Sequence, residues 1–389
     1  MKIGIIDADL LGRVHHKMPN LALMKLSNYH KKLGDSVDLI HYDDLNKSHL
    51  FTSKFDKVYL AKVFTDTPYP EFILKLPFVE YGGTGFFFDK SPRLPLEIEH
   101  TMPDYHLYDK WVRTQIMIKG RRKSFYEYFT DFSIGFTTRG CFRQCKFCIN
   151  QNEKKVYLHS PLSEFVDNDR KSITLFDDNI LGYPKCNDII RELQATKKTF
   201  EFKQGLDIRL LTDEKAKLLG ASRYSGNITF AFDNIKDKSL IEKKLTLFLP
   251  YAKHDYPSAI LYCFCCFDEN NIYDDTFWIK DIFDLFERIK ILMEHYCSPY
   301  IMMFEKHKES PYEYIYLFMR NWCNSIRLFK KQSFREYLAI YCHDKRMYRF
   351  MKNNPELVEK YFDLKYKRRK QNEQTTIIKS IRNGQTSIS

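Results

Sequence analysis

Six short segments rich in aliphatic, β-branched and aromatic residues recur through the middle of this 389-residue chain, about 27–41 residues apart. Stretches with the apolar spacing of amphipathic helices separate most of them. Strands that alternate with helices in this way form a parallel sheet. The pattern predicts an α/β fold in which residues 131–305 form a partial (β/α)6 barrel of the TIM type. The six strands are expected over 132–136, 173–176, 200–202, 228–232, 259–264 and 300–304, and helices over 187–194, 213–219, 240–247 and 278–293.

The first 85 residues show the same alternation on a smaller scale. The apolar run Ile3–Asp7 is typical of a strand buried on both faces, and a helical stripe follows from Pro19 to a stop at Gly34. Further strands are expected over 37–42 and 56–60. This order predicts a Rossmann-like domain with a parallel sheet over 1–85, with any ligand at the carboxyl ends of the strands.

A glycine-rich turn, Tyr81–Gly85, closes this predicted domain. It is either a plain tight turn or a loop in which the backbone approaches a ligand closely.

The remaining segments are expected to support these two domains. Residues 86–130, broken by three prolines, predict an irregular connector, and the basic run Lys119–Lys123 is expected to be a solvated surface. Residues 306–365 predict a helical C-terminal region, and the polar residues 366–389 a disordered tail.

Composition limits the class of protein. No apolar run reaches the ~18 residues of a membrane span, and acids interrupt the apolar start of the chain, so we expect a soluble cytoplasmic protein without a signal peptide. The formal net charge is +12. This charge favours RNA or another acidic partner, but a lysine-rich composition alone also produces it.

Three cysteines follow the first barrel strand with the spacing Cys-x3-Cys-x2-Cys, at Cys141, Cys145 and Cys148. Thiolates are the soft ligands that select iron–sulfur clusters or zinc. Three thiols hold three irons of a cubane and leave the fourth iron open, whereas a structural zinc site needs a fourth ligand. Cys186 and His159 are the nearest candidates for that ligand, and three buried structural cysteines are a further interpretation.

This spacing, with Phe147 directly before the last cysteine, resembles the signature of the radical S-adenosylmethionine (radical SAM) superfamily, whose fold would cover roughly residues 131–305. The resemblance implies that Cys141, Cys145 and Cys148 bind a 4Fe–4S cluster whose open iron binds S-adenosylmethionine. An electron from a flavodoxin- or ferredoxin-like reductant would then cleave this cofactor. The resulting 5′-deoxyadenosyl radical would abstract hydrogen from a substrate that the sequence does not identify.

The resemblance also implies cofactor-binding residues. Phe147 would lie near the adenine, or else only pack within its loop. Asp177 or Asp178, at the end of the second barrel strand, would receive the methionine ammonium, or else cap the next helix. Arg209 would pair with the cofactor carboxylate, or else form a structural pair with an aspartate.

An α/β domain before such a barrel resembles the radical SAM class with a cobalamin-binding domain. Those domains offer an Asp-x-His-x-x-Gly loop after the first strand, which the segment from Asp7 to His16 does not match. The sequence therefore leaves open whether the protein binds cobalamin and whether it transfers a methyl group.

Two other interpretations remain. One is a non-enzymatic zinc or iron–sulfur module that binds nucleic acid, and the other is an enzyme that modifies RNA or a peptide. The remaining cysteines, including Cys263, Cys265, Cys266 and Cys323, are expected in the core.

Overall fold

The computed structural model describes residues 1–40, 55–150, 152–253 and 257–367. These residues fall into two compact units. The first consists of residues 1–178 and 198–200, and the second of residues 179–197 and those from 201 on. The domain bounds expected from the sequence remain a prediction.

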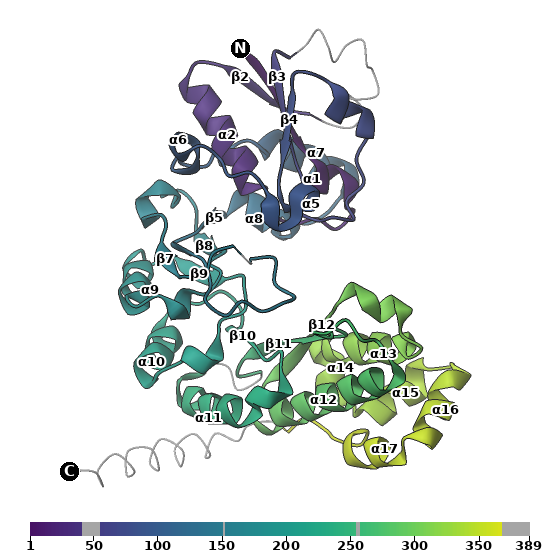
Figure 1. The fold of residues 1–389 in the computed structure, drawn as a ribbon. Helices are drawn as coiled ribbons and strands as arrows, with labels where there is room; N and C mark the ends of the chain where they lie inside the picture. The colour runs from purple at the N-terminus through teal and green to yellow at the C-terminus, as the bar shows by residue number, and fades with distance from the viewer. Residues whose placement is uncertain (41–54, 151, 254–256, 368–389) are drawn as a thin grey trace, which may run out of the picture. The chain divides into compact units, whose positions relative to one another are not determined.

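A parallel sheet of four strands, in the order β2-β1-β3-β4, opens the first unit (Figure 1). Helix α2 (Leu21–Lys32) provides the crossover that the parallel pair β1–β2 requires. The parallel α/β sheet predicted here is confirmed. Its strands are β1 (Lys2–Asp7), β2 (Ser36–Leu39), β3 (Lys57–Ala61) and β4 (Val79–Gly82).

The ends of these elements differ slightly from the prediction. Residues 41 and 42 of the second expected strand lie outside the described residues. Helix α2 begins after Asn20, whose side-chain oxygen accepts the backbone N–H of Leu23, so Pro19 precedes the cap. Gly34 ends the helix as expected, with φ +83°. Strand β4 is an addition to the predicted set.

Apolar side chains cover both faces of this sheet. Strand β1 alternates, with Ile3 and Ile5 in one cluster and Ile6 in another on the opposite face. The first cluster also takes in Tyr108 and Val112, from the segment predicted as an irregular connector. That prediction is wrong for Asp109–Lys119, which form helix α7 and pack against the sheet domain.

The first unit also contains strands β5 to β8 and residues 199–200 of β9. The sheet has the order β5-β8-β9, in which β5 and β8 pair in parallel, and β6 and β7 form an antiparallel pair. The strands are β5 (Phe132–Gly135), β6 (Thr138–Arg139), β7 (Tyr157–Leu158), β8 (Ser172–Leu175) and β9 (Thr199–Phe202). The other helices are α1 (Ala8–Gly12), α5 (Thr84–Phe87), α6 (Leu96–Glu99) and α8 (Glu127–Thr130), with 3-10 turns over 71–75, 88–90, 123–126 and 162–164.

The second unit contains a parallel sheet in the order β10-β11-β12, with α12 packed against β11 and β12 (Figure 1). Arg288 of α12 is buried and donates to the carbonyls of Phe232, Asp233 and Phe264, which satisfies backbone groups just after β10 and at β11. The elements are β10 (Thr229–Ala231), β11 (Ile260–Cys265), β12 (Ser298–Met303), α9 (Cys186–Ala195), α10 (Asp213–Ala221), α11 (Lys238–Phe248) and α12 (Asp275–Glu294), with 3-10 turns over 180–182, 208–210, 235–237, 249–251 and 305–309.

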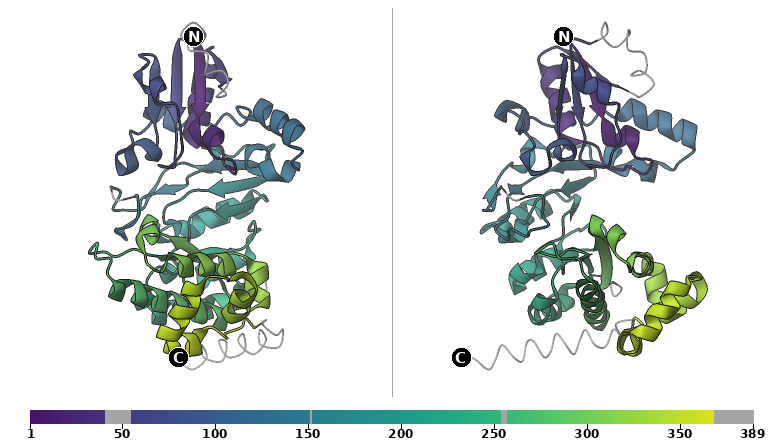
Figure 2. Two further views of the ribbon diagram at one scale, coloured as in Figure 1. Left: turned by 90° about the vertical axis from the view of Figure 1, so that its right-hand side faces the viewer. Right: turned by 45° about the vertical axis from the view of Figure 1, so that its right-hand side comes forward.

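All six strands and all four helices expected between 131 and 305 are therefore present, and the partial barrel that they were expected to build remains a prediction. The C-terminal region is helical, as predicted, and its helices gather together in the second unit (Figure 2). They are α13 (Glu313–Cys323), α14 (Ile326–Lys331), α15 (Phe334–Tyr341), α16 (Lys345–Asn353) and α17 (Pro355–Tyr361). Trp322 and Cys323 are fully buried there.

The predicted tail lies, from residue 368 on, outside the described residues. None of the described helices is both long and apolar enough to cross a bilayer.

Asp7, at the carboxyl end of β1, is a buried acid that links strand to helix. Its carboxylate caps α1 by accepting the N–H of Leu10 at 3.1 Å and accepts the hydroxyl of Tyr108 at 2.7 Å. Burial raises the pKa of Asp7 to about 6, despite the opposing effects of His16 and of these hydrogen bonds.

We expect the substitution Asp7→Asn to remove a pH dependence of stability. Because the folded-state pKa lies above its ordinary value of 3.8, Asp7 contributes stability at low pH that is lost as pH rises to about 6. The free energy of unfolding of wild type, relative to the variant, should fall by about 2 kcal/mol between pH 4 and pH 6. Parallel curves of urea unfolding against pH for the two proteins would contradict this.

Candidate functional site

The three-cysteine segment leaves the sheet β5-β8-β9 at the carboxyl end of β5. Thr138 and Arg139 form β6 and pair with Leu158 and Tyr157 of β7. Residues 140–156, called the cysteine loop below, connect these two short strands. The N–H of Cys141 donates to the carbonyl of Glu153, and the N–H of Cys148 donates to the carbonyl of Cys145, which folds the loop back on itself.

The three thiols of this loop differ from all other cysteines of the chain in exposure. Cys141, Cys145 and Cys148 are partly exposed, whereas the other seven cysteines are buried. The interpretation that they are buried structural residues is therefore wrong. The sulfur of Cys141 accepts the N–H of Arg143, and that of Cys148 accepts the N–H of Asn150, each at 3.4 Å.

Gly140 gives the loop its entry direction. Its φ is +89°, and a Cβ atom there would lie 2.0 Å from the carbonyl oxygen of Lys155. Only glycine fits this position without a shift of the backbone. Gln144, between the first two cysteines, also has a positive φ of 51°, and its side chain donates to the carbonyl of Cys141.

The returning half of the loop is held by the segment before α6. Arg93 forms an ion pair with Glu153, and the side chain of Asn152 donates to the carbonyl of Asp89 at 2.7 Å. Tyr157 donates to Glu153 as well. The region 86–95 therefore braces the cysteine loop, a role that its prolines and polar residues did not indicate.

Asp177 and Asp178, directly after β8, have different partners. The buried carboxylate of Asp177 accepts four hydrogen bonds, from the N–H and the hydroxyl of both Thr137 and Thr138, at 2.5–3.1 Å. The carboxylate of Asp178 accepts the N–H of Gly140 at 2.7 Å and lies 3.8 Å from Arg139. Neither caps the 3-10 turn over 180–182 or helix α9, so the capping interpretation is wrong.

The electrostatics of the pair follow from this geometry. Burial raises the pKa of Asp177, and the hydrogen bonds from Thr137 and Thr138 oppose it. Burial also raises the pKa of Asp178, while the charge of Arg139 lowers it. The side chain of Asp178 stays 23% exposed beside the entry to the cysteine loop. Of the two acids, Asp178 is the one with room for a further cationic partner.

The other predicted residues lie as follows. Phe147 is half-buried within the cysteine loop. His159 contacts Glu99, with 3.5 Å between Nε2 and Oε1, and its ring stacks on His100. Burial lowers the pKa of His159 to about 4. Cys186 is buried in the first turn of α9 in the second unit.

Arg209, in the second unit, is engaged with two aspartates. Its Nε donates to Asp207 at 2.7 Å, and another guanidinium nitrogen donates to Asp237 at 2.9 Å. Burial alone would lower the pKa of Arg209, but the hydrogen bond and charge of Asp207, with those of Asp237, raise it. This is the structural Asp–Arg pair that the sequence left open beside the cofactor role.

The glycine-rich turn Tyr81–Gly85, at the carboxyl end of the N-terminal sheet, packs closely against the backbone of residues 62–64. A Cβ at Gly83 would lie 2.3 Å from the carbonyl oxygen of Lys62, and one at Gly85 would lie 2.7 Å from that of Phe64. The turn is therefore the plain tight turn, with the close approach made to the chain itself. The carboxylate of Asp9 accepts the N–H of Val63 and the hydroxyl of Thr67.

The same region of the sheet is where a cobalamin-binding histidine would be expected. Helix α1 begins at Ala8, directly after β1, so the described residues place no histidine-bearing loop between the strand and this helix. His15 is exposed, and His16 lies edge-on to Phe64. The residues do not fit a cobalamin held by a histidine after the first strand.

Comparisons with known proteins find similarity to solved structures at low sequence identity. No family model matches the chain, and no curated protein matches it. Two solved structures of the cobalamin-dependent S-adenosylmethionine radical enzyme OxsB are similar, one with aqua-cobalamin and S-adenosylmethionine bound and one with aqua-cobalamin bound. Each match has a TM-score of 0.46, at 14% and 13% identity, and covers 91% of this chain. The chain spans 61% of the length of these structures.

We expect Gly140→Ala to disorder the cysteine loop, because the added Cβ meets a backbone oxygen and the residue has a positive φ. The variant should lose about 1–3 kcal/mol of stability. If the loop thiols bind metal in wild type, the variant should also lose most of that metal. Metal content per chain after reconstitution measures the effect. The control is Gly120→Ala, where φ is +57° and nothing lies within 4 Å. Equal metal in the Gly140 and Gly120 variants would contradict the role of Gly140.

We expect Asp177→Asn and Asp178→Asn to have different effects. An amide in place of the Asp177 carboxylate would leave part of the four donors from Thr137 and Thr138 unsatisfied, at a cost of about 1–3 kcal/mol of stability. Asp178→Asn keeps an acceptor for Gly140 and should leave stability almost unchanged, which thermal unfolding of both variants checks. An equal loss of stability in the Asp177→Asn and Asp178→Asn variants would contradict these different roles of the two acids.

Proposed function

We propose that this chain is a radical SAM enzyme in which Cys141, Cys145 and Cys148 bind a 4Fe–4S cluster. The observation that carries the proposal is the cysteine loop itself. It presents three partly exposed thiols at the carboxyl end of a strand in a parallel sheet, two of them hydrogen-bonded to amides, while every other cysteine is buried. A donor set of three thiolates fits a cubane with one open iron.

When bound, the cluster would supply the electron that cleaves S-adenosylmethionine to methionine and a 5′-deoxyadenosyl radical, which abstracts hydrogen from a substrate. The residues of this chain would bind and orient S-adenosylmethionine. Asp178 would accept the methionine ammonium, because its partly exposed carboxylate borders the first cysteine through Gly140. Phe147 would contact the adenine from within the loop. Asp177 would act only by fixing Thr137 and Thr138.

For Arg209, the contacts with Asp207 and Asp237 support the structural role in preference to the cofactor role. No step is assigned to cobalamin, since the described residues do not fit a histidine-ligated one. The proposal also includes the partial barrel over residues 131–305 and a flavodoxin- or ferredoxin-like reductant.

We expect anaerobic reconstitution with iron and sulfide to give about four irons per chain and a visible thiolate-to-iron charge-transfer band. Reduction with S-adenosylmethionine should then release 5′-deoxyadenosine. Cys145→Ala should abolish both, while Cys342→Ala, at a buried cysteine outside the loop, should keep both. Colourless wild-type protein with stoichiometric zinc would instead support the non-enzymatic module.

We also expect Asp178→Asn to lower the affinity for S-adenosylmethionine while the iron content stays at the wild-type level. Loss of a charge-assisted hydrogen bond corresponds to about 1.5–3 kcal/mol, or roughly a 10- to 100-fold increase in Kd. Equilibrium dialysis with the reconstituted protein measures this. An unchanged Kd would remove Asp178 from the site and leave the cluster proposal intact.

A further inference from the structure

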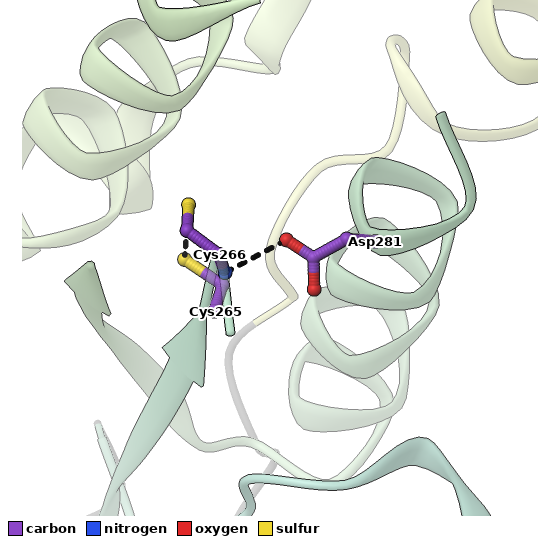
Figure 3. Close-up of side chains that lie close together, drawn as sticks. All are labelled: Cys265, Cys266 and Asp281. Carbon is purple, nitrogen blue, oxygen red and sulfur yellow. Dashed lines mark hydrogen bonds between the residues drawn. The ribbon is translucent and has the colours of Figure 1, made fainter. Parts of the chain in front are cut away.

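Cys265 and Cys266, at the end of β11, have their sulfur atoms 3.7 Å apart (Figure 3). Alternation along β11 buries Cys263 and Cys265 on one face. A regular strand would send the side chain of Cys266 to the opposite face. The φ of Cys266 is +66°, which ends the alternation and places the two neighbouring thiols side by side.

Asp281, from α12, adds a carboxylate to the two thiols (Figure 3). The sulfur atoms of Cys265 and Cys266 and a carboxylate oxygen of Asp281 all lie within 4.8 Å of one another. The carboxylate accepts the N–H of Cys266 at 2.9 Å and the hydroxyl of Tyr316 at 2.8 Å. Hydrogen bonds of this kind orient metal-binding carboxylates.

The distances suit one soft cation. Two thiolates at about 2.3 Å from a tetrahedral ion are about 3.8 Å apart, close to the 3.7 Å observed between these sulfur atoms. Thiolate ligands select zinc and related soft ions, whereas calcium and magnesium take oxygen ligands.

Charge balance points to a divalent ion. Both cysteines are buried, at 2% and 0% exposure, so a change in net charge there is costly. Binding of one dication to two thiols forms two metal–sulfur bonds, breaks two S–H bonds and releases two protons. The net charge of the site is then unchanged. A monovalent soft ion would leave an extra negative charge.

We propose that Cys265, Cys266 and Asp281 form a second metal site that binds a soft divalent cation such as Zn²⁺ through two thiolates and a carboxylate. The ion would connect the end of β11 to α12. Three protein ligands leave one tetrahedral position for water or another small ligand. The site shares no residue with the cysteine loop and does not depend on the function proposed above.

The test uses the full chain with Cys141, Cys145 and Cys148 replaced by alanine, so that the loop thiols cannot bind metal. After incubation with Zn²⁺ and removal of excess by gel filtration, about one zinc per chain is expected. Further replacement of Cys265 or Cys266 by alanine should abolish zinc binding. Asp281→Asn should lower the affinity for Zn²⁺ by at least about 10- to 100-fold. Loss of a group that only hydrogen-bonds to a metal ligand already has an effect of this size. Cys342→Ala is the matched control and should keep the zinc.

Two measurements test the proposal even if the variants at Cys265 and Cys266 fail to fold. In the loop variant with Cys265 and Cys266 intact, Co²⁺ should give a thiolate-to-cobalt charge-transfer absorption, and Zn²⁺ should protect both cysteines from alkylation, as located by peptide mass analysis. Absence of bound metal in the folded loop variant would overturn the proposal. So would zinc that stays bound at the same level without Cys265 and Cys266, or zinc that leaves both cysteines open to alkylation.

Discussion

The cysteine loop depends on one buried carboxylate. Asp177 accepts four hydrogen bonds from Thr137 and Thr138, which join the end of β8 to the bend between β5 and β6. A buried acid is stable only with such partners, since an unpartnered one costs several kcal/mol. With this bend held, Gly140 adopts its positive φ and Cys141 begins the loop at a defined place. The adjacent Asp178 is thereby left with the partly exposed position.

The cysteines of this chain fall into two groups by exposure. The three in the loop are partly exposed, and the sulfur atoms of Cys141 and Cys148 accept backbone N–H groups. The buried cysteines behave as small core residues, as for Cys323 beside Trp322. Cys265 and Cys266 are the exception among the buried ones, because the end of a strand and a positive φ bring two sulfur atoms and Asp281 together.

Strands and helices between 131 and 305 were predictable because apolar periodicity is a local signal. Helix α7 was not predicted, since Ile116, Met117 and Ile118 are three consecutive apolar residues, the last two mostly exposed, and this obscures the 3.6-residue period. The cysteine motif was visible from spacing alone. The different partners of Asp177 and Asp178 were not, because they depend on contacts with residues 38–40 positions earlier. The pairing of Arg209 with Asp237, 28 residues away, was hidden for the same reason.

We propose that the three thiols of the cysteine loop hold a cluster with one iron open to S-adenosylmethionine. Electron paramagnetic resonance of the reconstituted, reduced protein tests it most directly, because ligation of an open iron alters the spectrum of the reduced cluster. We expect a 4Fe–4S signal that changes when S-adenosylmethionine is added. A cluster signal that is identical with and without the cofactor, or reduced protein that gives no cluster signal, would contradict it.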